Sequence, residues 1–315
     1  MKSAATPKWC VLISAMRGAD HPMSSFYEFM EFSLLGLFSG GVLALIGLSF
    51  VLVYKGTRVI NFATGDVMML GAYLYYTCHV VLGWPLLIAF ALSIIGIAVL
   101  AFIIERSVLR PLSGQSVISV LMATIGISAV LHGLTEVVWG SDTHSTPSLL
   151  PRMPLNLGEI LIPGYVFGNF ILAAALITAF LLFFRYSRTG VTLRAVANDP
   201  VTACTMGIDI RNAQRLTWML AGLSGTVAGV LVAATAGLSP LLATTALGVF
   251  AVIILGGLDS IIGAIIAGLV IGWLDGVMVG YMGGKVREVV PYIVVLTILV
   301  FRPYGLFGTR TIERL

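Results

Sequence analysis

The stretch Val51–Tyr76, "VLVYKGTRVINFATGDVMMLGAYLYY", places a polar insert between two runs that are apolar enough to lie in lipid. Its polar residues are Lys55, Arg58, Asn61, Thr64 and Asp66. The insert also keeps Val59, Ile60 and Phe62, so it is too apolar for a plain loop. Non-helical backbone is tolerated at membrane depth only where protein or water satisfies its polar groups. We therefore expect 58–66 to be a broken helix, or else a re-entrant or juxtamembrane element with a purely structural role.

The composition of the chain predicts a membrane protein. Of 315 residues, 58% are hydrophobic and 10% are charged, whereas an average soluble domain carries about 25% charged residues. Runs near the ~20 residues that span hydrocarbon recur throughout, and ten-residue alternation typical of outer-membrane barrels is absent. The expected fold is an all-α polytopic membrane protein. Three cysteines without metal-ligand spacing predict neither a metal site nor a disulfide framework.

Eight apolar segments are expected to be membrane spans. They are 34–54, 67–82, 85–104, 116–138, 166–184, 216–236, 246–271 and 289–301. The seventh is interrupted at 256–260, which predicts a half-helix, a break and a longer helix to about Gly280. The predicted organisation is a partly disordered tail at 1–33, a membrane domain at 34–308 and a short tail at 309–315.

Arginine distribution predicts the orientation. The connection 185–215 holds five arginines and 105–115 holds two, so both are expected in the cytoplasm, whereas 139–165 holds only Arg152 and is expected outside. The basic C-terminal tail should also lie inside. Eight full spans would put it outside, but a seventh segment that crosses twice removes the conflict. Alternation in "LNLGEILIPGY" predicts a short hairpin in 139–165 that is either a docking surface or a passive connector.

Glycines recur every fourth residue in the seventh segment. They are Gly268, Gly272, Gly276, Gly280 and Gly284. This spacing puts them on one helix face, where another helix can approach closely. The partner helix is expected to belong to the same chain or, as the alternative, to a second subunit.

Few ionisable residues fall within the apolar runs, and each is a functional candidate. His132 and Glu136 are four apart and could hydrogen-bond, or Glu136 could simply anchor the outer helix end. Asp275 could face an aqueous path, a neighbouring subunit or a helix end. Asp259 is expected to cap the helix that begins at Ser260 or the next residue. None of these forms a triad, a carboxylate pair or a metal cluster, so neither an enzyme nor a cofactor is expected.

The segment "NDPVTACTMG", Asn198 to Gly207, has the signals of a short helix. Asp199 suits the N-cap, Pro200 the first helical position and Gly207 a left-handed end. About two turns are expected between them. Val201 and Cys204 should lie on one face, and Ala203 and Met206 on another. One apolar face then remains for a partner, or else the segment packs only on its own bundle.

Four blocks, in order, resemble one family. They are "GGVLALIGLSFVLVYKGTRVINFATGDVMMLGAY", "LRAVANDPVTACTMGIDI", "LGGLDSIIGAIIAGLVIG" and "FRPYGLFG". Together they resemble the LivH-type inner-membrane permeases of branched-chain amino-acid ABC importers, over about residues 34–308. Asn61, Phe62, Ala63 and Gly65 match the N-F-A-x-G element of that family, and Gly256, Gly257, Ser260 and Gly263 match its glycine-rich block. Thr64 stands where many relatives have histidine, which leaves the solute open among branched-chain amino acids, amides and urea.

The resemblance implies a transport subunit of the bacterial inner membrane with several partners. They are a second permease, expected to form a heterodimer, two cytosolic ATP-binding subunits and an external solute-binding protein. The chain has no phosphate-binding loop, which is consistent with ATP hydrolysis by the partner subunits. The expected translocation residues are Asn61, Phe62, Thr64, Gly65, Asp66 and Asp275. The helix at Asn198–Gly207 is expected to couple to the ATPase. The alternatives are a stand-alone secondary transporter or channel, and an intramembrane enzyme.

Overall fold

The computed structural model describes residues 22–112, 114–147, 155–157, 160–284, 289–302 and 305–308. The expected tails at 1–21 and 309–315 lie outside the described residues. The N-terminal half contains α2 (Pro22–Thr57), α3 (Thr64–Tyr76), the π-helix η1 (Thr77–Val81), α4 (Leu86–Ile104), the π-helix η2 (Glu105–Leu109) and α5 (Val117–Trp139). The rest contains β1 (Leu155–Leu157), β2 (Ile160–Ile162), α6 (Gly164–Tyr186), α7 (Arg188–Asn198), α8 (Pro200–Thr205), α9 (Ile210–Ala236), α10 (Leu242–Gly248), α11 (Phe250–Gly256), α12 (Ile261–Met282) and α13 (Val290–Phe301).

Every apolar segment expected from the sequence is helical, which confirms the all-α polytopic membrane fold. Six helices among the described residues are long and apolar enough to cross a membrane: those that include α2, α4, α5, α6, α9 and α12. α3 runs directly into η1, and α13 is a shorter apolar helix. α2 begins at Pro22, twelve residues before the expected start of the first span. The tail predicted at 1–33 is therefore helical in its last part, where Phe32 packs against Gly280.

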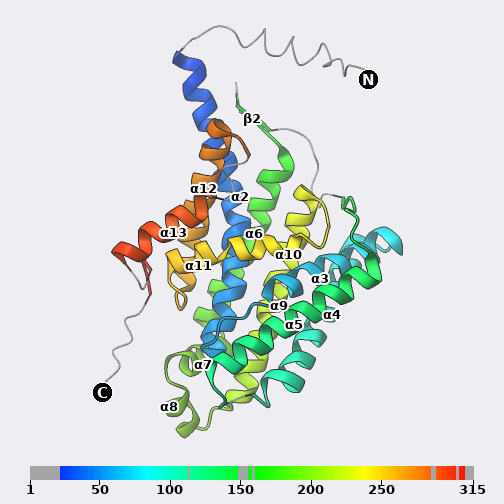
Figure 1. The fold of residues 1–315 in the computed structure, drawn as a ribbon, viewed down its shortest axis with the longest axis vertical. Helices are drawn as coiled ribbons and strands as arrows, with labels where there is room; N and C mark the ends of the chain where they lie inside the picture. Colours follow the sequence, from blue (N-terminus) through cyan, green and yellow to red (C-terminus); the bar gives the residue numbers. More distant parts are fainter. Residues whose placement is uncertain are drawn as a thin grey trace.

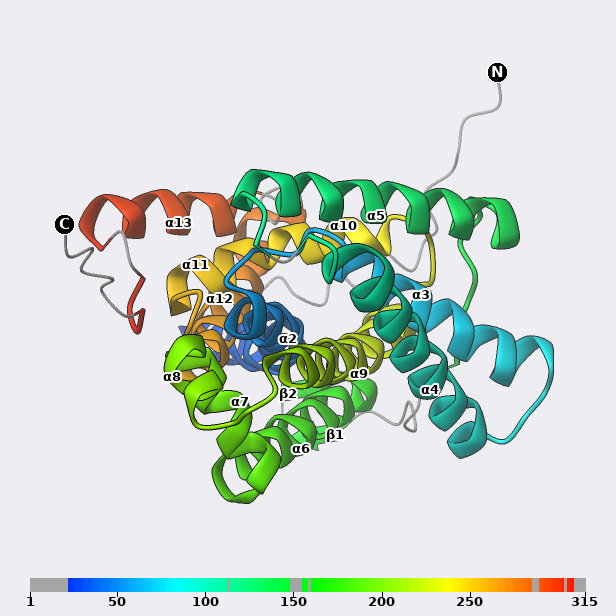
Figure 2. The ribbon, with the colours of Figure 1, turned by 90° about the horizontal axis from the view of Figure 1, so that it is seen from below.

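α2 is the central helix of the bundle and is surrounded by α6, α9, α11 and α12 (Figures 1 and 2). Its most apolar window is 83% buried by the rest of the chain. α5 lies along one edge, on the same side as α13 (Figure 2), and its corresponding window is only 17% buried. The apolar core thus forms around α2, and α5 is left largely exposed.

The crossing of α2 and α12 explains the glycine repeat. A Cβ at Gly272 would lie 2.2 Å from the Cα of Gly40, and one at Gly276 would lie 2.4 Å from the Cα of Gly36. Gly268 faces Ala44 in the same way. The pairing shows that the helices run antiparallel and that their backbones are in contact. The partner of Gly268, Gly272, Gly276 and Gly280 is therefore a helix of the same chain.

The seventh apolar segment is a helical hairpin. α10 and α11 lead to Gly257, whose φ of 98° suits glycine, and the chain then reverses into α12. Gly256 and Gly263 meet across the turn. The expected break at 256–260 is present. The N-cap of α12, however, is Ser260, whose hydroxyl accepts from the backbone N–H of Gly263 at 3.0 Å. The cap predicted at Asp259 is wrong by one residue, because a cap must directly precede the first helical residue.

The connection between α5 and α6, which the arginine pattern predicts to be external, contains the predicted hairpin. β1 and β2 pair antiparallel, with Leu155 opposite Ile162 and Leu157 opposite Ile160. A second backbone pairing joins His144 to Leu238 beyond the end of α9. These pairings lie at the opposite end of the bundle from α7 and α8 (Figure 1). In accordance with the arginine pattern, we call the end with α7 and α8 the cytoplasmic end.

Candidate translocation site

The polar insert forms a break between α2 and α3, which we define as residues 58–63. Arg58 turns the chain with a φ of 58°, in the left-handed region that non-glycine residues seldom adopt. The Asn61 side chain accepts from the N–H of Ala63 at 3.0 Å, and the Thr64 hydroxyl donates to the Asn61 carbonyl at 3.1 Å. The N–H of Phe62 donates to the Thr124 hydroxyl at 3.4 Å. Protein groups thus satisfy backbone that has left the helix, as expected at membrane depth.

Two of the expected pathway residues have packing roles. A Cβ on Gly65 would lie 2.6 Å from the carbonyl oxygen of Ala243, so glycine lets α10 approach the start of α3. The ring of Phe62 lies 5.3 Å from that of Phe250. Both contacts hold the break against the α10–α11 hairpin.

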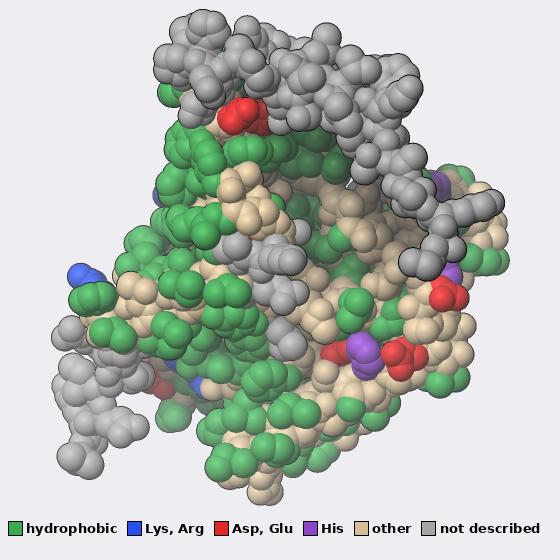
Figure 3. All heavy atoms as spheres, turned by 45° about the horizontal axis from the view of Figure 1, so that its top comes forward, with side chains coloured by type: hydrophobic (Ala, Val, Ile, Leu, Met, Phe, Trp, Pro, Cys, Tyr) green, Lys and Arg blue, Asp and Glu red, His purple; other side chains and the backbone are tan. Residues whose placement is uncertain are grey.

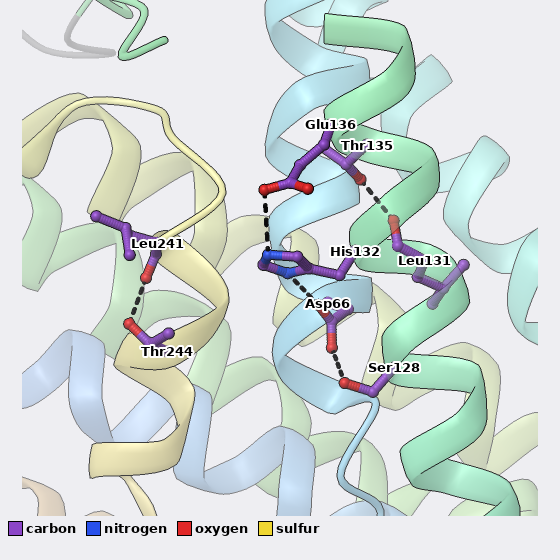
Figure 4. Close-up of polar contacts among 8 residues, drawn as sticks. All are labelled: Asp66, Ser128, Leu131, His132, Thr135, Glu136, Leu241 and Thr244. Carbon is purple, nitrogen blue, oxygen red and sulfur yellow. Dashed lines mark hydrogen bonds and ion pairs between the residues drawn. The ribbon is translucent and has the colours of Figure 1, made fainter. Parts of the chain in front are cut away.

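Asp66, in the first turn of α3, is the centre of a polar cluster with α5 (Figure 4). Its carboxylate accepts a short hydrogen bond from the Ser128 hydroxyl and contacts Nδ1 of His132 at 3.1 Å. Nε2 of His132 lies 3.8 Å from a carboxylate oxygen of Glu136. We call these four residues the Asp66 cluster. The Asp66 side chain is buried, whereas those of His132 and Glu136 are 36% and 48% exposed.

The cluster continues a polar column along α5. Thr124, Ser128, His132 and Glu136 are four residues apart and so lie on one helix face. At 1.5 Å per residue they cover about 18 Å of the helix. Sequence reasoning noticed only His132 and Glu136; the four-residue spacing of Thr124 and Ser128 was the signal for the rest. Neighbouring faces of α5 are open, with Val130 and Val137 exposed.

The face seen in Figure 3 is mostly hydrophobic, and a histidine lies there between acidic side chains. Such groups are costly in hydrocarbon unless they face protein or water. The Asp66 cluster therefore faces an aqueous path or a partner protein.

A cavity of about 220 Å³ lies at the cytoplasmic end of the column. It is lined by Thr57 at the end of α2 and residues 58–61 of the break, by Thr124 of α5, by Gln214 and Trp218 of α9, and by Glu105, Arg110 and neighbours between α4 and α5. We call it the cytoplasmic cavity. The break separates this cavity from the Asp66 cluster, and Thr124 contacts the break from α5.

α7 and α8 form the cytoplasmic segment with the predicted caps. Asp199 is the N-cap of α8 and accepts from the N–H groups of Val201 and Thr202 at 3.0 and 3.2 Å. Hydrogen bonds from the side chain and backbone of Thr202 lower the pKa of Asp199 below its ordinary value of 3.8. Pro200 opens the helix, and Gly207 has a φ of 80°. α8 has six residues, fewer than the expected two turns.

The faces of α8 differ from the expectation. Val201, Cys204 and Met206 are exposed, whereas Ala203 is 4% exposed and packs on its own chain. Met206 lies beyond the last helical residue, so Ala203 and Met206 do not share one face. The preceding helix reaches the break, because the Arg58 guanidinium donates a short hydrogen bond to the carbonyl of Ala197 in α7. A direct contact thus joins α7 to the break between α2 and α3.

Comparison with known proteins identifies the family. Residues 33–299 match the model of the branched-chain amino acid transport system permease component. The high-affinity branched-chain amino acid transport system permease protein BraD of Pseudomonas aeruginosa is 30% identical over 93% of this chain and 100% of its own. LivH of Escherichia coli K12 is 28% identical over 92% and 98%, and the probable LivH of Methanocaldococcus jannaschii is 29% identical over 85% and 89%. The chain belongs to this permease family.

The permease is a multi-pass transport subunit of the plasma membrane. Its described residues hold no group of three or more His, Cys, Asp or Glu side chains that could bind a metal ion. Asp275 of the permease lies on α12 beside Gly276, which packs on α2. It belongs to neither the Asp66 cluster nor the lining of the cytoplasmic cavity. Of the expected pathway residues, the structure brings together Asn61, Phe62, Thr64, Gly65 and Asp66, but not Asp275.

Proposed function

We propose that this permease is a membrane-spanning subunit of an ABC importer that moves branched-chain amino acids along the polar column of α5. The observation that carries the proposal is the continuous run of polar groups from Glu136 through the Asp66 cluster to Asn61. Solute would pass between α5 and α3 and then cross the break.

The chemistry of the Asp66 cluster supports an amino acid as the solute. Two carboxylates flank one imidazole, so acidic groups outnumber basic ones in the cluster. The negative charge of the carboxylates favours a cationic group such as the α-ammonium of an amino acid. Neutral amides and urea would gain little from that charge, which favours amino acids over the other solutes of similar permeases.

The open surface of α5 supports a partner permease. Val130 and Val137 are 68% and 85% exposed beside the partly exposed cluster. Lipid can cover the valines, but the half-exposed carboxylate of Glu136 requires water or protein. A second permease packed along this edge would enclose the column between the two subunits. We propose a heterodimer.

α8 is the proposed contact with two cytosolic ATP-binding subunits. Val201 and Met206 are 75% and 78% exposed in the cytoplasmic segment, which is typical of a docking surface. The hydrogen bond from Arg58 to Ala197 would carry motion from this surface to the break. A proton-coupled secondary transporter is the second candidate, because His132 and Asp66 form a carboxylate–histidine pair of the kind used in proton relays.

Reconstitution distinguishes the two. Proteoliposomes that hold the permease, its partner permease, the ATP-binding subunits and the external solute-binding protein should take up leucine only with ATP, and urea should not compete. Uptake by the permease alone, driven by a proton gradient, would instead establish the secondary transporter. Saturable ATP binding by the isolated permease would also contradict the proposal.

Asn61→Leu tests the pathway within the same assay. The leucine side chain is similar in size but removes the acceptor that the N–H of Ala63 uses. We expect loss of uptake with near-normal expression and assembly. Uptake at the wild-type rate would make the break a structural element only.

A further inference from the structure

The cytoplasmic cavity contains buried polar groups that the permease itself leaves without hydrogen-bond partners. Trp218 lines the cavity and is 4% exposed, and no described residue accepts from its indole Nε1–H. Glu105 also lines it, is 3% exposed, and its Oε2 has no hydrogen-bond donor among the described residues. Most buried polar groups in proteins are hydrogen-bonded, so an unmet donor and an unmet acceptor around one cavity need an explanation.

The nearest charged neighbour of Glu105 does not supply the missing hydrogen-bond donor. Nε of Arg215 lies 3.6 Å from Oε2 of Glu105, which is an ion-pair distance and longer than a hydrogen bond. Arg215 instead lies over the ring of Phe102, with 5.2 Å from Cζ to the ring centroid. Oε2 of Glu105 thus still has acceptor capacity.

The backbone around the cytoplasmic cavity is irregular in two segments. Glu105 begins the π-helix η2, which interrupts the regular hydrogen bonding after α4. Short π-helical turns are frequent at functional sites because they redirect side chains. On the opposite wall, Arg58 adopts its left-handed conformation and Asn61 is buried at 3% exposure. Two irregular segments, one on each wall, therefore form the cavity.

The charges and the volume indicate the ligand. Arg58 and Arg110 line the cavity and are exposed, so they can meet a carboxylate that enters from the cytoplasm. Glu105, deeper in, can accept from an ammonium group. Drug-sized ligands occupy about 300–1,000 Å³, so a cavity near 220 Å³ suits a much smaller solute. The combination of cationic rim, buried carboxylate and small volume matches a free α-amino acid.

We propose that the cytoplasmic cavity is a second solute site, which binds an amino acid from the cytoplasm and slows the importer as the internal concentration rises. The identity of the amino acid as the transported one rests on the proposed function. We expect import to slow because Arg58 and Asn61 belong both to the cavity lining and to the break. A ligand that holds them would hold the break in one conformation.

Binding can be measured separately from transport. The assembled complex in nanodiscs, without ATP or solute-binding protein, is titrated with leucine while its tryptophan fluorescence is recorded, and Trp218→Phe identifies the part of the signal that comes from the cavity. We expect leucine to bind saturably. Two analogues should bind more weakly: 4-methylpentanoate, which lacks the ammonium group, and leucinamide, which lacks the carboxylate. Equilibrium dialysis with labelled leucine provides a second readout that does not depend on Trp218.

Two arginines provide the matched variants. Arg110→Gln should weaken leucine binding about tenfold, because a hydrogen bond to a charged group is lost, and should relieve inhibition of ATP hydrolysis by leucine. Arg106→Gln, exposed on η2 one turn before Arg110 but outside the cavity lining, should change neither leucine binding nor inhibition. If leucine does not bind in either readout, or binds Arg110→Gln and wild type equally, the cavity is not this site. ATP-driven uptake that continues in that case would leave the proposed function intact.

Discussion

Two helix contacts of the permease, α2 with α12 and α3 with α5, are built in opposite ways. α2 meets α12 through glycine backbones, so close that a Cβ at Gly272 would lie 2.2 Å from Gly40. α3 meets α5 through the polar side chains of the Asp66 cluster, and a Cβ added at Gly126 or Gly133 of α5 would have no neighbouring atom within 4 Å among the described residues. The first contact leaves no room for movement. The second holds two helices together by a few charged hydrogen bonds and leaves space beside them.

This difference suits the α2–α12 contact to a rigid scaffold and the α3–α5 contact to the proposed pathway. Close backbone packing gains dispersion energy over many atoms and tolerates no displacement. A polar contact depends on only a few atoms and can exchange protein partners for a solute. The proposed pathway thus lies on α5, the least buried of the candidate spans among the described residues.

The largest effect is expected at the glycine crossing. Gly272→Leu puts a side chain where the backbone of α2 already lies, and overpacking costs about 1–3 kcal/mol or more. We expect the subunit to aggregate in detergent, as measured by size-exclusion chromatography, or to lose its thermal transition, as measured by a melting curve. The matched variant Gly126→Leu, on open α5, should remain monodisperse. Equal behaviour of the two variants would mean that the crossing is not the scaffold.

A substitution in the polar contact between α3 and α5 should reduce uptake more than it reduces stability. Asp66→Asn keeps the shape and an acceptor oxygen for the Ser128 hydroxyl, so it removes only part of the stabilisation of about 1.5–3 kcal/mol that hydrogen bonds to a charged group contribute. Initial leucine uptake should fall at least tenfold while the melting temperature changes little. Asp275→Asn, outside the cluster, should have a smaller effect. Complete loss of uptake there would move the pathway toward α12.

α8 presents both kinds of surface in one short helix. Val201→Glu changes an exposed side chain and should uncouple ATP hydrolysis from uptake several-fold with normal stability. Ala203→Glu forces a charge into a buried position and should lower stability of the isolated permease. Crosslinking from Cys204 to cysteines on the ATP-binding subunit would locate the contact. Full coupling in Val201→Glu, with no crosslink, would exclude docking at α8.

The smallest effect concerns the cap of α8. Because hydrogen bonds lower the pKa of Asp199, the capping contribution is complete above the ordinary value of 3.8 and is lost as pH falls through the lowered value. Amide exchange in α8, corrected for its intrinsic pH dependence, should show constant protection from neutral to mildly acidic pH and a loss only below about pH 4. Thr202→Val removes the hydroxyl donor and should move that loss to higher pH. An unchanged profile would assign the stability of α8 to its packing.

Local chemistry made much of this permease predictable from its sequence. α5 runs from Val117 to Trp139 where hydropathy predicted 116–138, because the need to bury apolar side chains acts residue by residue. The cap at Asp199 and the break after Arg58 were also predictable, since caps and interrupted hydrogen bonding depend on neighbours within a few positions. The error at Asp259 has the same origin, because two adjacent residues can both cap and only the helix phase decides between them.

Only the tertiary structure could decide which distant residues meet. Asp66 and His132 are far apart in the sequence, and their pairing depends on the way α10 and Thr124 hold the start of α3 against α5. The choice of α2 as the partner of the glycine repeat, and the enclosure of Glu105 and Trp218 in one cavity, likewise depend on helix packing. The sequence determined where the helices begin, break and end, through interactions that act over one or two turns. Their packing determined the site, because its contacts join side chains from helices that have no local interaction with each other.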